Sequence, residues 1–185
     1  KAVELAQLNL LLKILEEETR DTKKRILPNM KNNIKNGNSL IDDYKVAGDK
    51  AFNWNAQFPD VFRNGGFDIV VGNPPYVNIE NVKQKERDYL LKNYKLVKGR
   101  FDLYAVFMER VLEILQKNGK FSFIIPFPFT YERYAEKLRE EIIDKYTINE
   151  ILDLSKNKIF NDAIVRNVVF ILTKAKKIQN KFKIT

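Results

Sequence analysis

The sequence predicts an α/β fold with a mostly parallel sheet and one antiparallel strand near the C-terminal edge. Short apolar segments of strand length occur at residues 67–71, 121–125, 147–154 and 167–173. Segments with the apolar spacing of helices separate the first three, and a polar loop separates the last two. Strands that alternate with helices are typical of α/β sheets.

The segment 67–71 is the best defined of these strands. Four of its five residues are apolar, and glycines flank it, so we expect a strand that is buried on both faces. Asn-Pro-Pro-Tyr (residues 73–76) follows at once. Proline cannot donate to a sheet ladder, so two in succession end the strand in a rigid turn. Open α/β sheets bind their ligands at this carboxyl end of the strands.

The chemistry of this turn suits a planar group that carries an exocyclic amine. Asn73 offers an amide oxygen, Pro74 offers a carbonyl that can only accept, and Tyr76 offers a flat aromatic face. The amine of adenine is a poor nucleophile because its lone pair is delocalised into the ring. Two hydrogen bonds from the amine to Asn73 and Pro74 would favour a tetrahedral nitrogen whose lone pair points at an electrophile.

Composition excludes several classes of chemistry. The 185 residues contain no Cys, which rules out disulfides, thiolate metal sites and the cysteine nucleophile of cytosine-C5 methylation. They contain no His, which rules out Ser-His triads, HExxH zinc sites and zinc deaminases. Lys and Arg outnumber Asp and Glu by 33 to 24, and the net charge of +9 fits a polyanionic partner. No apolar run has the length of a membrane span and no signal peptide is visible, so we expect a cytoplasmic protein.

Two motifs together resemble a known family. Asn-Pro-Pro-Tyr after an apolar strand resembles the catalytic motif of S-adenosylmethionine-dependent amino-methyltransferases, especially the γ-class N6-adenine DNA methyltransferases. The run Asp102-Leu103-Tyr104-x-x-Phe107 resembles a further motif of that class. The most similar arrangement is that of the methyltransferase segments of type IIG enzymes, which combine restriction and modification. The resemblance implies a Rossmann-like methyltransferase fold, catalytic roles for Asn73, Pro74 and Tyr76, and double-stranded DNA as partner.

The resemblance also implies where the methyl donor, S-adenosyl-L-methionine, would bind. Leu103 and Phe107 match the positions that flank the donor's adenine, although their periodicity alone predicts core residues. Asn38 matches a residue beside that adenine, at the end of a short strand expected in residues 34–41. A simple turn at Gly37-Asn38 is the alternative.

A second aromatic residue is implied for the target base. Phe160 lies in the polar loop before the last strand, where the family has an aromatic side chain that stacks on a base rotated out of the duplex. With Tyr76 it would form the walls of a base pocket. The alternative is a phenylalanine that folds back as a hydrophobic plug.

One expected element is missing. The chain contains no GxG-type loop, and it opens inside an apolar helix at residues 2–18. We therefore expect residues 1–185 to form part of one methyltransferase catalytic domain. The first two strands and the target-recognition domain would lie outside it, so the donor site would be incomplete and the chain alone inactive. Target-recognition and nuclease domains could be fused to it or associated with it.

Three other functions stay open. The Asn-Pro-Pro-Tyr motif also occurs in methyltransferases that act on RNA bases or on protein glutamine. The run Asp43-Tyr44-Lys45 could mimic the end of a nuclease site, although no Pro-Asp pair precedes it suitably. An inactive DNA-binding remnant is the third alternative.

The remaining pattern gives three expectations about helices. A short helix is expected in residues 49–61, and a longer one is expected to begin near residue 103 and to stop at Gly119. Thr130 is the expected N-cap of a helix that carries Tyr134 and Leu138.

Overall fold

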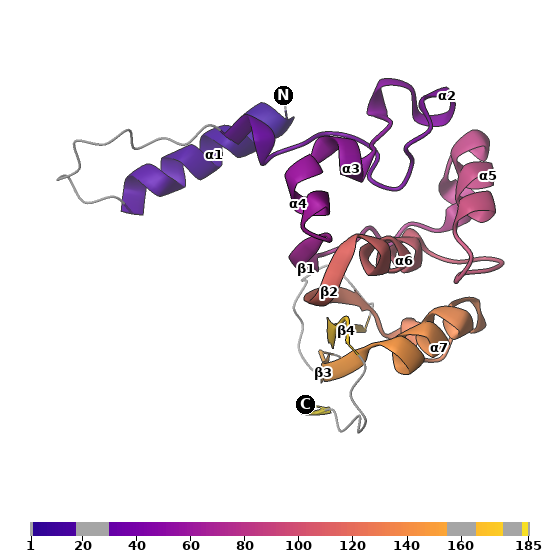
Figure 1. Ribbon diagram of the computed structural model, residues 1–185. Coiled ribbons are helices and arrows are strands. Elements are labelled where there is room, and N and C mark those ends of the chain that lie inside the picture. The colour runs from indigo at the N-terminus through magenta and orange to yellow at the C-terminus, as the bar shows by residue number, and fades with distance from the viewer. Residues whose placement is uncertain (1, 18–29, 155–165, 176–182, 185) are drawn as a thin grey trace. The chain divides into compact units, whose positions relative to one another are not determined.

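The chain forms two compact units, residues 1–58 and 59–185. This computed structural model describes residues 2–17, 30–154, 166–175 and 183–184 (Figure 1). No helix in these ranges is long and apolar enough to cross a membrane.

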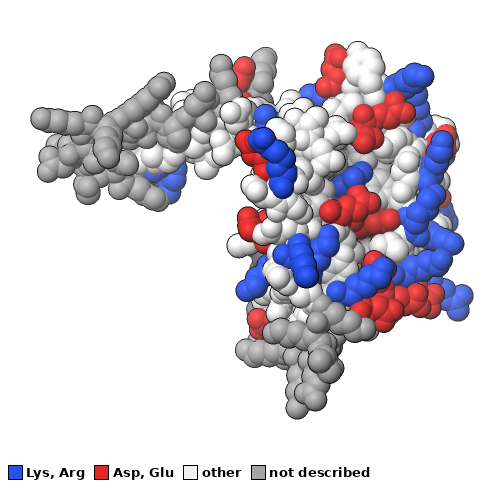
Figure 2. Space-filling model, in the orientation of Figure 1, with Lys and Arg blue, Asp and Glu red and all other residues white. Residues whose placement is uncertain are grey.

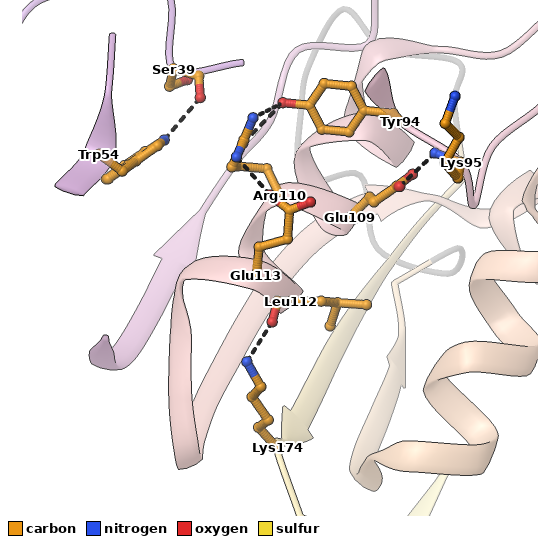
Figure 3. Close-up of polar contacts among 9 residues, drawn as sticks. All are labelled: Ser39, Trp54, Tyr94, Lys95, Glu109, Arg110, Leu112, Glu113 and Lys174. Atoms are coloured by element: carbon orange, nitrogen blue, oxygen red, sulfur yellow. Dashed lines mark hydrogen bonds and ion pairs between the residues drawn. The ribbon is translucent and has the colours of Figure 1, made fainter. Parts of the chain in front are cut away.

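The unit 1–58 is built from short elements after one long helix. Its elements are α1 (Ala2–Glu17), η1 (Met30–Asn32), α2 (Tyr44–Ala47), η2 (Gly48–Lys50) and α3 (Trp54–Gln57). The strand expected in residues 34–41 is wrong: only an isolated bridge joins Asn38 to Ala51. The Trp54 indole packs against the rings of Phe52 and Phe58, with centroids 5.0 and 5.8 Å away, and its Nε1 donates to the Ser39 carbonyl at 2.9 Å (Figure 3). Trp54 is therefore a packing residue of this unit.

The unit 59–185 contains a mixed sheet. Its strands are β1 (Phe67–Gly72), β2 (Leu115–Pro126), β3 (Thr147–Asp153), β4 (Asn167–Thr173) and β5 (Lys183–Ile184), in the order β1-β2-β4-β3-β5. β1 pairs with β2, and β3 with β5, in parallel, whereas β4 is antiparallel to both of its neighbours. The prediction of one antiparallel strand is confirmed, and β4 lies inside the sheet, between β2 and β3.

Helices and turns connect these strands. They are α4 (Pro59–Arg63), η3 (Ile79–Asn81), α5 (Gln84–Asn93), α6 (Leu103–Ile114), η4 (Phe127–Thr130), η5 (Arg133–Ala135) and α7 (Glu136–Lys145). The single helix expected in residues 49–61 is two, because Pro59 begins a new one; proline is well suited to the first position of a helix. Thr130 caps no helix: its hydroxyl donates to the Phe127 carbonyl at 2.8 Å, inside η4.

The core lies on one face of the sheet. On β2 and β4 the side chains that share this face are all buried: Phe121, Phe123, Ile125, Val168, Phe170 and Leu172. Helices α6 and α7 lie on the same side of the sheet (Figure 1). The other face is open among the described residues, and on β1 the side chains of Ile69 and Val71 are 65% and 75% exposed. The expectation that β1 is buried on both faces is therefore wrong for the described residues, among which nothing covers the face that carries Ile69 and Val71 and β1 is the first strand in the sheet order.

The junction between α6 and β2 is unusually tight. The helix ends at Ile114 and the strand begins at Leu115, so Gly119 lies within the strand and does not stop the helix. The start of β1 passes close to this junction at Gly66, which has φ +120°. A Cβ atom at Gly66 would lie 2.4 Å from the Ile114 carbonyl oxygen. Only glycine allows this approach.

Gly66→Ala should therefore destabilise the fold by more than the cost of placing alanine at a positive φ. We expect a loss of about 3 kcal/mol or more, because the left-handed backbone costs about 1–2 kcal/mol and the clash adds a further overpacking cost. Gly99→Ala is the matched control: Gly99 also has a positive φ, +76°, but an added Cβ would meet no atom within 4 Å. It should lose only about 1–2 kcal/mol in chemical denaturation. Equal losses for both variants would contradict the tight junction.

Candidate active site

The Asn-Pro-Pro-Tyr turn lies where the carboxyl ends of β1 and β2 meet. The two strands are parallel, and Gly72 at the end of β1 is opposite Phe123 of β2. Asn73 follows β1 directly and is exposed, whereas Pro74 is buried. Within the described residues, neither the Asn73 side chain nor the Pro74 carbonyl takes part in a hydrogen bond. These two acceptors thus belong to consecutive residues at this edge of the sheet.

Tyr76 extends from this turn over the neighbouring strand. Its hydroxyl donates to the Ile124 carbonyl of β2 at 3.1 Å, and its ring is half-buried. Burial raises the pKa of this hydroxyl above its ordinary value of 10.0, so it stays protonated and donates. The ring meets the Tyr104 ring edge to face, with centroids 6.1 Å apart and planes at 77°. Tyr76 therefore presents a half-exposed aromatic surface with a fixed far end.

A short backbone ladder ties the turn to the start of α6. The Ile79 amide donates to the Phe101 carbonyl and the Leu103 amide donates to the Val77 carbonyl, each at 2.8 Å. Between them, the Asn78 side chain donates to the Asp102 carboxylate at 3.3 Å. These main-chain bonds hold the segment after the Asn-Pro-Pro-Tyr turn against the first residues of α6.

The α6 side chains predicted to flank the donor's adenine lie on one face of the helix. Leu103 and Phe107 are one turn apart and both are half-buried, whereas Tyr104 and Met108 are fully buried. The reading of Leu103 and Phe107 as fully buried core residues does not hold. Two partly exposed apolar side chains, joined by the ladder to the turn, fit a flat aromatic ligand, and the donor-binding role stays a prediction.

Two predicted site residues are not placed relative to this arrangement. Asn38 belongs to the unit 1–58; its amide hydrogen donates to the Lys50 carbonyl at 2.6 Å, and its Oδ1 accepts from the Leu40 amide at 3.2 Å. One lone pair of that oxygen remains for a ligand. Phe160 lies outside the described residues. Their roles stay predictions.

Asp43, the acidic residue of the nuclease alternative, has a structural role. The Asp43 carboxylate accepts from the Lys45 amide at 2.8 Å and is the N-cap of α2. The part of the chain that the structure describes contains no group of three or more acidic side chains that could hold a metal ion.

A buried carboxylate, which sequence reasoning missed, anchors the segment between α5 and α6. Glu109 on α6 is 6% exposed and accepts from the backbone amides of Lys95 and Leu96 at 2.7 and 3.0 Å (Figure 3). Next to it, Arg110 donates twice to the Tyr94 hydroxyl, at 2.9 and 2.6 Å. The sequence does carry a signal for this buried carboxylate: Glu109 is a charged residue on a helical face whose neighbouring positions, Ala105 and Leu112, are apolar.

The fold is that of S-adenosylmethionine-dependent methyltransferases, as the sequence predicted. A class I methyltransferase of this kind from Listeria monocytogenes matches 65% of this chain and 36% of its own, with a TM-score of 0.52 and 19% identity. The M protein of the type I restriction enzyme EcoKI matches 98% of this chain and 31% of its own, with a TM-score of 0.59 and 19% identity.

The chain belongs to the Eco57I restriction-modification methylase family, whose sequence model matches residues 1–160. It is 33% identical over 180 residues to RM.Eco57I of Escherichia coli, a type II restriction enzyme and methyltransferase. That match covers 94% of this chain but only 18% of the relative. The predicted resemblance to the methyltransferase segments of restriction-modification enzymes is confirmed.

The buried carboxyl of Glu109 should make stability depend on pH. Burial raises its pKa above the ordinary 4.5, against the opposing effect of the Lys95 and Leu96 amides. A carboxyl whose pKa is higher in the folded than in the unfolded protein contributes stability at low pH. That contribution is fully present below the pKa of the unfolded state and is lost as the pH rises through the pKa of the folded state. The stability advantage of the wild type over Glu109→Gln should therefore shrink as the pH rises from below the ordinary carboxyl pKa through the raised pKa of Glu109 in denaturation experiments. Glu140→Gln, an exposed change on α7, is the control, and a gap that widens with pH would contradict the prediction.

Proposed function

We propose that this protein methylates the N6 amine of adenine in double-stranded DNA. The observation that carries the proposal is the pair of unengaged acceptors, the Asn73 amide oxygen and the Pro74 carbonyl, at the carboxyl edge of the sheet beside the half-buried Tyr76. Membership of a restriction-modification methylase family supports it. The activity, the substrate and the partners of the whole protein are part of the proposal.

The chain's own residues would orient the amine. Asn73 Oδ1 and the Pro74 carbonyl accept one hydrogen bond each from the two N–H atoms. These bonds favour a tetrahedral nitrogen and stabilise the positive charge that develops on it as it attacks. No covalent bond to the protein is needed, which agrees with the absence of Cys and His from the sequence.

S-adenosyl-L-methionine, when bound, supplies an electrophilic methyl group. Leu103 and Phe107 would hold its adenine between their side chains, and the free lone pair of Asn38 Oδ1 would accept from that adenine's amine. Apolar side chains and a single amide acceptor suit an aromatic base rather than a charged group. The GxG-type loop that holds such donors in related folds does not occur in residues 1–185.

The target base must leave the duplex to reach Asn73. Extrusion costs a few kcal/mol, which stacking partners offset. Tyr76 would supply one wall of the pocket and Phe160 the other. We further propose that residues 1–185 are part of one catalytic domain that works with target-recognition and nuclease domains, fused or associated.

Asn73→Ala should abolish most turnover while leaving DNA binding intact. The variant loses an acceptor used in the transition state, and such a loss costs about 10²–10³ in kcat. Asn73→Asp keeps an oxygen acceptor and should retain more activity than Asn73→Ala. The measurements are methyl transfer to an unmethylated duplex by the protein at its full natural length, sequencing for N6-methyladenine, and DNA affinity.

Asn93→Ala is the control, because Asn93 is an exposed amide on α5 that donates only to the Tyr89 carbonyl. It should have wild-type turnover. Methylated cytosine, methylated RNA or methylated protein glutamine in place of N6-methyladenine would each overturn the substrate assignment. DNA binding without any transfer by the wild type would favour an inactive remnant.

A pair of lysines supports a polynucleotide partner. The Lys98 amide donates to the Tyr134 carbonyl at 3.2 Å, which brings the segment after α5 to the start of α7, where Lys137 lies. The neighbouring ammonium of Lys137 lowers the pKa of Lys98 below its ordinary value. No carboxylate pairs with Lys98 within the described residues. Figure 2 shows Lys and Arg side chains gathered along the side that carries α5 and α7. A phosphate placed between the two ammonium groups would relieve their repulsion.

The double variant Lys98→Gln/Lys137→Gln should weaken DNA binding and reduce its salt dependence. Each phosphate contact contributes about 0.9 to the slope of log K against log salt, so the slope should fall by about 1–2. Lys117→Gln/Lys120→Gln removes the same charge at the opposite, amino end of β2 and is the control. Equal changes of slope in the two double variants would show a diffuse charge effect and would contradict a phosphate contact at Lys98.

A further inference from the structure

Tyr76 is anchored at a point that does not fix its plane. Its hydroxyl donates to the Ile124 carbonyl, and the hydroxyl oxygen itself lies on the long axis of the ring. Rotation about this axis moves both ring edges but leaves the hydroxyl in place. The corresponding torsion of tyrosine is intrinsically broad. A wall that stacks on a base needs a defined plane, so a second contact must set it.

The ring of Tyr104 provides that contact. It meets Tyr76 edge to face at 77°, and Tyr104 itself is 0% exposed. Rotation of the Tyr76 ring would drive an edge into Tyr104, because buried rings have no free volume beside them. The edge-to-face geometry is also a favoured one for two aromatic quadrupoles.

Tyr104 is itself held by two further aromatic residues. Its ring meets Phe129 and Tyr134 edge to face, with centroids 6.4 and 6.5 Å away. Its hydroxyl hydrogen-bonds the hydroxyl of Tyr134. Burial raises the pKa of both hydroxyls, so both stay protonated and either one can donate to the other. These contacts join α6 to η4 and η5, which follow β2.

We propose that Tyr104 is a positioning residue that fixes the plane of Tyr76 and so builds the stacking wall for the extruded base. The inference rests on the proposed function only where it says that the ring stacks on an extruded base. The mechanical claim concerns only this chain: the Tyr104 ring restrains the rotation of Tyr76. The hydroxyl of Tyr104 holds its own ring and does not touch Tyr76.

The direct test measures the motion of the Tyr76 ring. 3-Fluorotyrosine is incorporated at position 76 of the whole protein, and ¹⁹F spectra are recorded for the parent, Tyr104→Phe, Tyr104→Leu and Phe170→Leu. The parent and Tyr104→Phe should show resolved ring orientations, whereas Tyr104→Leu should show a single averaged line. Phe170→Leu is the matched core control, because Phe170 packs on Phe129 at 5.3 Å and belongs to the same buried face. It should resemble the parent.

The functional readout uses natural Tyr76 and a DNA duplex with 2-aminopurine at the target position. Tyr104→Leu should lower kcat at least about tenfold with KM for DNA changed little, and should raise the fluorescence of the poorly stacked base. Tyr104→Phe should recover most of kcat. If Tyr104→Leu does not fold, Tyr104→Met replaces it in both experiments.

The outcomes separate this inference from the proposed function. An unchanged ¹⁹F spectrum in Tyr104→Leu, or equal averaging in Phe170→Leu, would overturn the positioning role. Activity losses that follow only the loss of melting temperature in both variants would overturn it as well. A wild type that transfers no methyl group to adenine would overturn the proposed function, whereas the ¹⁹F result would still decide the role of Tyr104.

Discussion

The parallel pairing of β1 with β2 is the interaction on which the rest of the site depends. It sets Gly72 opposite Phe123, so that β1 ends one residue before the level at which β2 offers the Ile124 carbonyl. A Cβ at Gly72 would lie 2.8 Å from the Phe123 ring, so the close approach of the strands there needs glycine. A slip of one residue would also turn Ile69 and Val71 toward the core and expose Val70. Register therefore decides whether Tyr76 finds its acceptor.

The main features of the sheet could be predicted from sequence because they are locally encoded. Prolines end β1 and β2, and the strands β3 and β4 are short apolar runs between polar residues. The turn at residues 73–76 was identifiable for the same reason: its residue types and their order carry the chemistry. The family comparisons confirm the class of protein and leave the roles of single residues to experiment.

Other features could not be predicted because tertiary contacts decide them. Nothing local predicts that Ile69 on β1 is exposed, or that α6 ends at Ile114, five residues before the expected stop at Gly119. The segment around Asn38 has the composition of a strand but forms one bridge. Tyr104 was read only as part of a motif, and its burial among three rings depends on η4 and η5, which no periodicity marks. The contacts of Glu109 could not be predicted either, because its partners are main-chain amides 13 and 14 residues away in the sequence.

The anchor of Tyr76 has a consequence for protein engineering. Its acceptor is a main-chain oxygen, which every amino acid at position 124 supplies, so no side chain there is needed to keep the ring in place. A designer who wishes to graft the Asn-Pro-Pro-Tyr turn onto another scaffold thus needs no matching partner side chain for the hydroxyl. What has to be transplanted is a pair of parallel strands in the right register, with glycine at the end of the first.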